Sequence, residues 1–201
     1  QQVIEKNAYI WFNRLCALRF MDANGFTRIA VVSPKNDQTQ PEILVEAKSG
    51  YFDDSLTPKD TQNEVISFIN RSSPSNDPES EAYRLLIVTA CNYYHKAMPY
   101  LFVRISDFTE LLMPDNLLSS GSVLHNTLEV MTDDSCKEVE IIGWLYQHYI
   151  SEKKDEVFAD LKKNKKITPE NIPAATQLFT PHWIVRYLTE NSLGRLWLLN
   201  N

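Results

Sequence analysis

Helical spacing of apolar residues recurs along most of this chain and constrains its fold more than any other feature. It is strongest at residues 5–25, EKNAYIWFNRLCALRFMDANG, where apolar side chains cover much of the helical circumference. We therefore expect a helix buried on more than one side and ended by Gly25 in a left-handed conformation. Arg19 and Asp22 lie three positions apart on it. We expect a structural ion pair between them, with an anchor for a neighbouring domain as the alternative.

Further segments with helical spacing follow at residues 41–50, 57–70, 79–97 and 134–166. Between residues 106 and 130 the pattern predicts shorter helical pieces, with Ser106 or Asp107, and Ser122, as N-caps. The β-branched run RIAVVS, residues 28–33, predicts one short strand. The predicted fold class is therefore mainly α, a multi-helix bundle with at most a short β-hairpin.

Composition excludes several classes of protein. With 43% hydrophobic and 23% charged residues the chain is globular, and it has no apolar run long enough for a transmembrane helix. Its three widely spaced cysteines indicate reduced thiols of a cytoplasmic protein. No membrane partner is expected. The net charge of −6 argues against this chain binding a DNA duplex through electrostatic attraction alone. The chain begins in the middle of a helical pattern without Met, so we expect it to come from a longer protein.

No complete active site is evident in the sequence. The four histidines, His95, His125, His148 and His182, lack the spacing of metal ligands, and no metal site is predicted. The glycine-rich loops that cradle phosphates are absent, as is a GxSxG motif. A lysine cluster, Lys162, Lys163, Lys165 and Lys166, predicts a solvated helix end; the alternative is a patch that contacts nucleic-acid phosphates.

Residues 174–198, AATQLFTPHWIVRYLTENSLGRLWL, begin a new helix near the end of the chain. Thr180 is predicted as its N-cap and Pro181 as its first residue, with Phe179 packing back as a staple-type residue. Local evidence alone favours plain helix capping. A helix N-terminus of this kind also suits a carboxylate, such as the methionine end of S-adenosylmethionine.

The segment QLFTPHWIVRYL resembles motif X of adenine-N6 DNA methyltransferases of the gamma arrangement. Residues 7–25 and 141–198 extend the resemblance to PglX-like methyltransferases of BREX phage-exclusion systems and related type IIG enzymes. The resemblance implies S-adenosylmethionine as cofactor, with Phe179, Thr180 and Pro181 beside it and Gln177 orienting the turn. It also implies a scaffold role for four residues of the first helix, Trp11, Arg14, Arg19 and Asp22.

Two family motifs have no counterpart in this sequence. The glycine-bearing motif I and the catalytic (N/D)PPY motif, which holds the flipped adenine, are absent. We therefore expect an N-terminal helical domain at residues 1–166, and a linker with the motif X helix at 167–201 that leads into a methyltransferase core. The chain alone is expected to be inactive. The expected partners of the whole protein are double-stranded DNA, its own core and other phage-defence subunits.

A second reading assigns the chain to another class. A helical interaction module could dock defence-system partners or a phage-encoded DNA mimic through Tyr146, Tyr149, Trp183 and Trp197, which look exposed in the sequence pattern. Direct DNA binding through the lysine cluster is a third reading, and it predicts affinity that falls steeply with salt.

Overall fold

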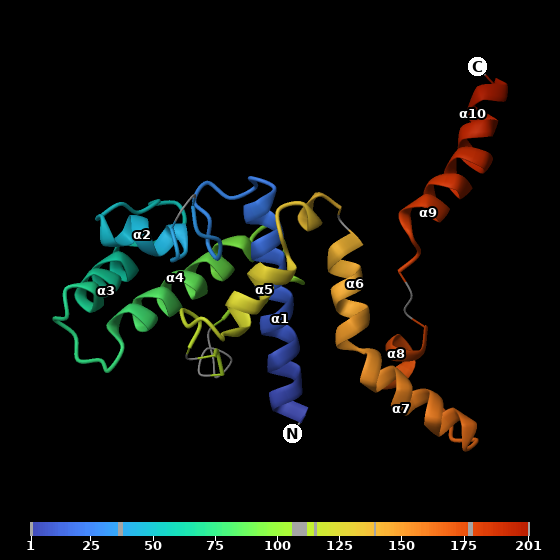
Figure 1. The fold of residues 1–201 in the computed structure, drawn as a ribbon, viewed down its shortest axis with the longest axis horizontal. Helices are drawn as coiled ribbons and strands as arrows, with labels where there is room; N and C mark the ends of the chain where they lie inside the picture. Colours follow the sequence, from blue (N-terminus) through green and yellow to red (C-terminus); the bar gives the residue numbers. More distant parts are fainter. Residues whose placement is uncertain are drawn as a thin grey trace. The chain divides into compact units, whose positions relative to one another are not determined.

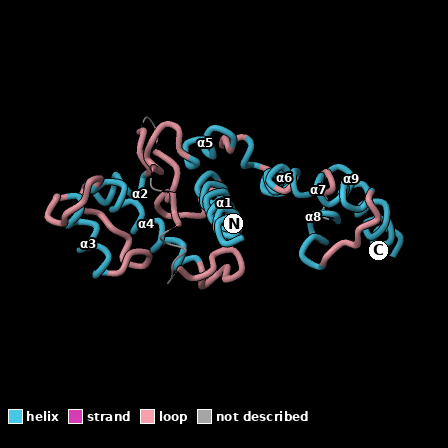
Figure 2. The backbone as a smooth tube through the Cα atoms, turned by 90° about the horizontal axis from the view of Figure 1, so that it is seen from below, coloured by secondary structure: helices cyan, strands magenta, loops and turns pink. Residues whose placement is uncertain are grey.

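The chain folds into α-helices joined by turns and loops (Figure 1). The computed structural model describes residues 2–35, 38–105, 112–114, 116–138, 140–176 and 179–200. Within these ranges there is no β-strand (Figure 2). An isolated antiparallel bridge joins Pro34 to Pro41. The predicted mainly α class is confirmed. The chain divides into two compact units, Gln1–Lys137 and Glu138–Asn201.

The first unit holds one hydrophobic core that draws on several helices. Its elements are α1 (Gln2–Ala23), α2 (Glu42–Lys48), α3 (Lys59–Ile69), α4 (Pro78–Tyr94), α5 (Val123–Val130) and the 3-10 helix η1 (Ser135–Lys137). Helix α4 packs on α2 and α3, and α1 packs on α5. Leu18, Leu44, Val65 and Leu86, one from each of the first four helices, are fully buried in this core. Truncating one of these leucines to alanine costs roughly 2–5 kcal/mol.

Most predicted helices of this unit are confirmed, with shifted ends. Helix α4 begins after Asp77, whose carboxylate caps it by accepting the N–H of Ser80 at 3.2 Å. Ser122 caps α5 as predicted, because its Oγ accepts the N–H of His125 at 3.0 Å. The predicted caps Ser106 and Asp107 lie outside the described residues.

Asp22 organises the loop that follows α1. Gly25 ends the helix with φ +67, as predicted, and the chain then turns back over Asp22. The Asp22 carboxylate accepts the successive N–H groups of Val31, Val32 and Ser33 at 2.9–3.0 Å. The predicted strand at 28–33 is therefore wrong, because these donors bind a carboxylate instead of a neighbouring strand. Burial raises the pKa of Asp22 even though these N–H groups lower it.

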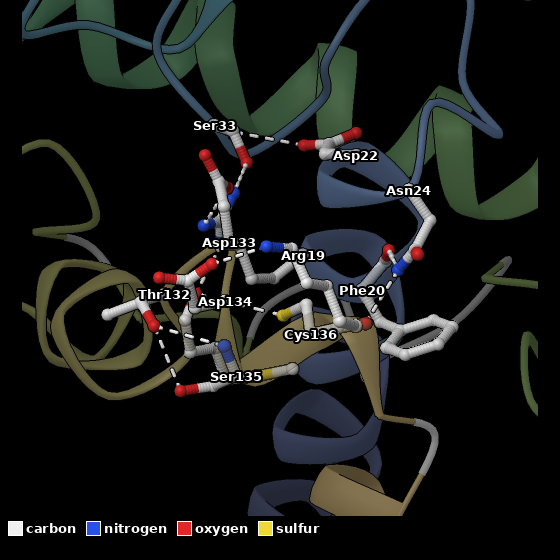
Figure 3. A network of polar contacts seen from close by, with 12 residues as sticks. Arg19, Phe20, Asp22, Asn24, Ser33, Thr132, Asp133, Asp134, Ser135 and Cys136 are labelled. Atoms are coloured by element: carbon white, nitrogen blue, oxygen red, sulfur yellow. Dashed lines mark hydrogen bonds and ion pairs between the residues drawn. The ribbon is translucent and has the colours of Figure 1, made fainter.

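Arg19 ties α1 to the segment before η1 (Figure 3). Its Nε donates to the Met131 carbonyl at 2.7 Å, Nη1 to Ser33 Oγ at 2.9 Å, and Nη2 to Asp133 Oδ1 at 2.7 Å. The predicted ion pair with Asp22 is wrong, since the loop N–H groups take up that carboxylate. Arg19 is 7% exposed, so its bonds join the helix to two distant segments inside the unit.

The second unit has a small core and a long terminal helix. Its elements are α6 (Glu140–Tyr149), α7 (Ser151–Lys162), the 3-10 helix η2 (Pro169–Asn171), α8 (Ile172–Thr176), α9 (His182–Thr189), the π-helical segment η3 (Glu190–Gly194) and α10 (Arg195–Asn200). Helices α6, α7 and α8 bury Ile141, Val157 and Ala174, whereas α9 to α10 bury no residue. The domain boundary predicted at 166/167 falls inside this unit, between α7 and η2.

Candidate cofactor-binding turn

The turn Phe179–Thr180–Pro181 leads directly into α9. Pro181 is the N-cap of this helix, with φ −52 and ψ 140, and no side chain caps it. The predicted N-cap at Thr180 is therefore wrong by one residue: Pro181 keeps an extended backbone, so helical geometry begins only at His182. The Pro181 carbonyl accepts the N–H groups of Ile184 and Val185 at 3.0 and 3.3 Å, which closes the first turn of the helix.

Phe179 lies against α6. Its ring meets Tyr146 edge-on, with centroids 6.3 Å apart and planes at 77°. The ring also occupies the space over Gly143, where a Cβ atom would come within 2.6 Å of the ring Cγ. The staple-type contact predicted within α9 is replaced by this contact with α6. Phe179 thus fixes the start of the turn to another helix of the same unit.

Gly143 is the residue that sequence reasoning missed. It lies inside α6, in the run EIIGWLYQHY, where glycine costs about 1 kcal/mol of helix stability relative to alanine. A glycine at such a position indicates a close approach by another group. A glycine inside a predicted helix was therefore the sequence feature that could have indicated a close contact here, but it does not identify Phe179 as the neighbour.

The exposed face of the turn offers hydrogen-bond donors. The first N–H groups of a helix have no partner in a preceding turn, and no side chain covers those of α9. Thr180 and Pro181 are both exposed, and the Thr180 hydroxyl makes no hydrogen bond to any described residue. Such a turn can receive a carboxylate at the positive end of the helix. Gln177, the fourth predicted site residue, lies outside the described residues.

The lysine cluster lies at and just after the end of α7. Lys162, Lys163, Lys165 and Lys166 are all exposed. Lys165 pairs with Asp160 at 2.8 Å and, through that hydrogen bond, lowers the pKa of the Asp160 carboxyl. The other three lysines form no ion pair with the part of the chain that is described, so they can meet a phosphate without breaking one.

Helices α9 to α10 expose a large apolar surface. Trp183 and Trp197 are each 70% exposed, and Leu193, Leu198 and Leu199 are exposed to a similar degree. Of the other two aromatic residues predicted to be exposed, Tyr146 is half-buried and the side chain of Tyr149 lies outside the described part. An apolar surface of this extent marks a site for contact with another surface.

Over the described ranges, no group of three or more His, Cys, Asp or Glu side chains is arranged to hold a metal ion. His95 bonds to the Phe102 carbonyl at 2.8 Å, and His125 lies 3.3 Å from Glu129. No helix in the described part is both long and apolar enough to cross a membrane.

Sequence comparison shows which proteins this chain is similar to. No family model matches the chain. Along 98% of its length, however, it is similar to adenine-specific methyltransferases, which confirms the resemblance to PglX-like enzymes. It is 40% identical over 198 residues to the adenine-specific methyltransferase BrxX of Escherichia coli O9:H4 (strain HS). It is 39% identical over 204 residues to the adenine-specific methyltransferase PglX of Lacticaseibacillus casei (strain Zhang).

The matches cover only a small part of these relatives. The chain spans 15% of the length of BrxX and 16% of the length of PglX. The activity of a whole methyltransferase therefore does not follow from this chain alone.

Proposed function

We propose that this chain is the N-terminal helical part of an S-adenosylmethionine-dependent, adenine-N6 DNA methyltransferase of a phage-defence or restriction–modification system. The observation that carries the proposal is the 39–40% identity to adenine-specific methyltransferases over 98% of the chain. In this proposal the chain, which holds no (N/D)PPY motif, contributes structure and part of the cofactor site and is inactive when alone. The remaining catalytic groups belong to a downstream core.

In this proposal the turn Phe179–Thr180–Pro181 forms one wall of the cofactor pocket. The uncapped start of α9 supports it, because its N–H groups can receive the carboxylate of the methionine moiety. The docking of Phe179 on Gly143 and Tyr146 supports it as well, since a binding turn must be held in place. These residues bind and orient the cofactor, and the transfer of its methyl group takes place in the core.

The test uses the full-length protein that contains residues 1–201. Phe179→Ala and Thr180→Val should each weaken S-adenosylmethionine binding in calorimetry by about tenfold, the equivalent of roughly 1.4 kcal/mol. Thr189→Val makes the same chemical change at the far end of α9, where the hydroxyl bonds to the Val185 carbonyl at 2.9 Å, and it should leave affinity unchanged. Tight cofactor binding by the 201-residue chain alone would contradict the proposal.

A second candidate function is protein docking, and the exposed apolar face of α9 to α10 favours it. On this reading Trp183 and Trp197 are covered by a defence-system subunit or a phage-encoded DNA mimic. On the first reading the downstream core covers them. Acrylamide quenching of the tryptophans distinguishes the two: protection in the full-length protein alone supports the core, and protection that appears only with added partner supports docking.

Direct DNA contact by the lysine cluster is the third reading, and the absence of ion pairs at Lys162, Lys163 and Lys166 within the described residues favours it. If Lys162, Lys163 and Lys166 meet phosphates, replacing all three with glutamine should reduce the slope of log affinity against log salt by roughly 2–3. An unchanged slope in the full-length protein would remove the cluster from the DNA interface.

A further inference from the structure

A basic cavity lies in the first unit, remote in sequence from the cofactor-binding turn. It has a volume of about 490 Å³ and opens between the start of α3, the last turn of α4 and the residues after α4. The basic side chains that line it are His95, Lys96 and Arg104, and no described carboxylate lines it. The whole chain has 26 acidic and 20 basic residues, so this grouping of basic side chains runs against the overall charge. It produces a local positive potential.

The two aspartates directly before the lining residue Ser55 already have other partners. Asp53 accepts the N–H of Ser55 at 2.9 Å and lies 3.7 Å from Arg28. Asp54 pairs with Lys59 at 2.6 Å. Neither aspartate lines the cavity, and each has its own cation, so they do not neutralise the basic side chains that do.

The segment that carries Arg104 is fixed to α4 by side-chain hydrogen bonds. Asn92 accepts the N–H of Ile105 at 2.8 Å and donates to its carbonyl at 3.3 Å. His95 Nδ1 lies 2.8 Å from the Phe102 carbonyl. A carbonyl only accepts, so Nδ1 carries the hydrogen, and this bond ties the ring to the segment that carries Arg104. The backbone at Arg104 is thus held beside the cavity before any ligand arrives.

The lining chemistry matches a phosphate attached to a larger group. Lysine and arginine are the usual binders of phosphate, and the Thr61 hydroxyl adds a donor that makes no hydrogen bond to other described residues. Lys96 Nζ lies 5.6 Å from the centre of the Tyr93 ring, which holds the ammonium group at the cavity. Leu56 and Tyr93 give an apolar wall, and the volume is in the range of small-molecule sites.

We propose that this cavity binds one phosphate group of a nucleotide, either a free nucleoside monophosphate or a backbone phosphate of nucleic acid. Arg104 and Lys96 neutralise the phosphate, Thr61 donates to its oxygens, and the attached group lies along Leu56 and Tyr93. The site uses no residue of the motif X turn, so it is independent of the proposed cofactor pocket.

Calorimetry on the 201-residue chain tests this with AMP, adenosine and a short DNA duplex as probes. AMP should bind at least about tenfold more tightly than adenosine, because the phosphate supplies the charge-assisted bonds. The double variant Lys96→Gln/Arg104→Gln should weaken AMP binding by at least about tenfold. Lys6→Gln makes the same kind of charge change at an exposed site on α1 outside the cavity, and it should leave AMP binding unchanged.

Competition identifies the source of the phosphate. If the duplex displaces AMP, and the double variant weakens both, the ligand is a nucleic-acid backbone; if AMP binds and the duplex does not compete, it is a free nucleotide. The proposal is overturned if neither AMP nor the duplex binds, if adenosine matches AMP, or if Lys6→Gln weakens binding as much as the double variant. Circular dichroism checks that each variant folds. The cofactor affinity of the full-length protein reports separately on the motif X turn.

Discussion

Replacing Gly143 with alanine should displace the Phe179 ring. The added Cβ would lie 2.6 Å from the ring Cγ and 2.8 Å from Cε1. Carbon atoms normally pack at about 3.5–4.0 Å, so these positions overlap. Gly143 is buried in the middle of α6 and its backbone is held by the helix. The ring is 38% exposed and has room to move, so we expect Phe179 to leave the helix face.

Two opposing effects set the magnitude. Alanine favours the helix over glycine by about 1 kcal/mol. Overpacking costs roughly 1–3 kcal/mol. With Phe179 present, the sum of these two effects means that Gly143→Ala leaves the stability of α6 unchanged or lowers it by up to about 2 kcal/mol. With Phe179→Ala the overlap disappears, and the same Gly143→Ala change should stabilise α6 by about 1 kcal/mol. The double-mutant cycle should therefore give a coupling of roughly 1–3 kcal/mol.

Amide hydrogen exchange of α6 measures this coupling, because it reports the free energy of local opening. Gly194→Ala is the matched control in a helical segment of the same unit. Its Cβ would lie 3.5 Å from the Thr189 carbonyl oxygen, an ordinary contact, so helix stability there should rise. Equal stabilisation of α6 by Gly143→Ala with and without Phe179 would refute the contact between the ring and the glycine.

Three further outcomes are expected. Thr180→Val should change unfolding free energy by less than about 0.5 kcal/mol, measured in urea, because Pro181 and not Thr180 starts α9. Arg19→Met should cost about 3 kcal/mol in the same assay because it leaves buried oxygens without donors. The control Lys35→Met removes an exposed ion pair with Glu42 and should cost much less. Burial raises the pKa of Cys16 and Cys91 to about 12, so iodoacetamide at pH 8 should modify these thiols only after unfolding. Because the pKa of about 12 in the folded chain exceeds the ordinary value of 9.0, folding favours the protonated thiols. The stability that these two thiols contribute is therefore present below pH 9 and is lost as pH rises toward 12.

The helices were predictable from sequence because their signals are local. Apolar spacing, capping residues and the left-handed Gly25 all act within a few positions of one another. The segment 28–33 shows where this reasoning fails. Its β-branched residues favour a strand, but Asp22 captures their N–H groups, and composition alone does not reveal that contact.

The candidate site was predictable in part. The resemblance to motif X identified Phe179, Thr180 and Pro181, and local rules placed a helix start there with an error of one residue. The contact that holds the turn, between Phe179 and Gly143, was not predictable, because these residues meet only after α6 to α9 have folded. Long-range pairs of this kind depend on the path of the chain and leave no periodic signal in sequence.

The π-helical segment Glu190–Gly194 has a consequence for the direction in which the terminal helix presents its side chains. A π turn accommodates one extra residue, and one residue of an α-helix corresponds to a rotation of about 100°. Leu188 and Leu196 are eight positions apart in the chain, but with one residue absorbed they relate as positions i and i+7, which share a face. The segment therefore corrects the phase of the helix, so that Leu188 and Leu196 lie on the same face.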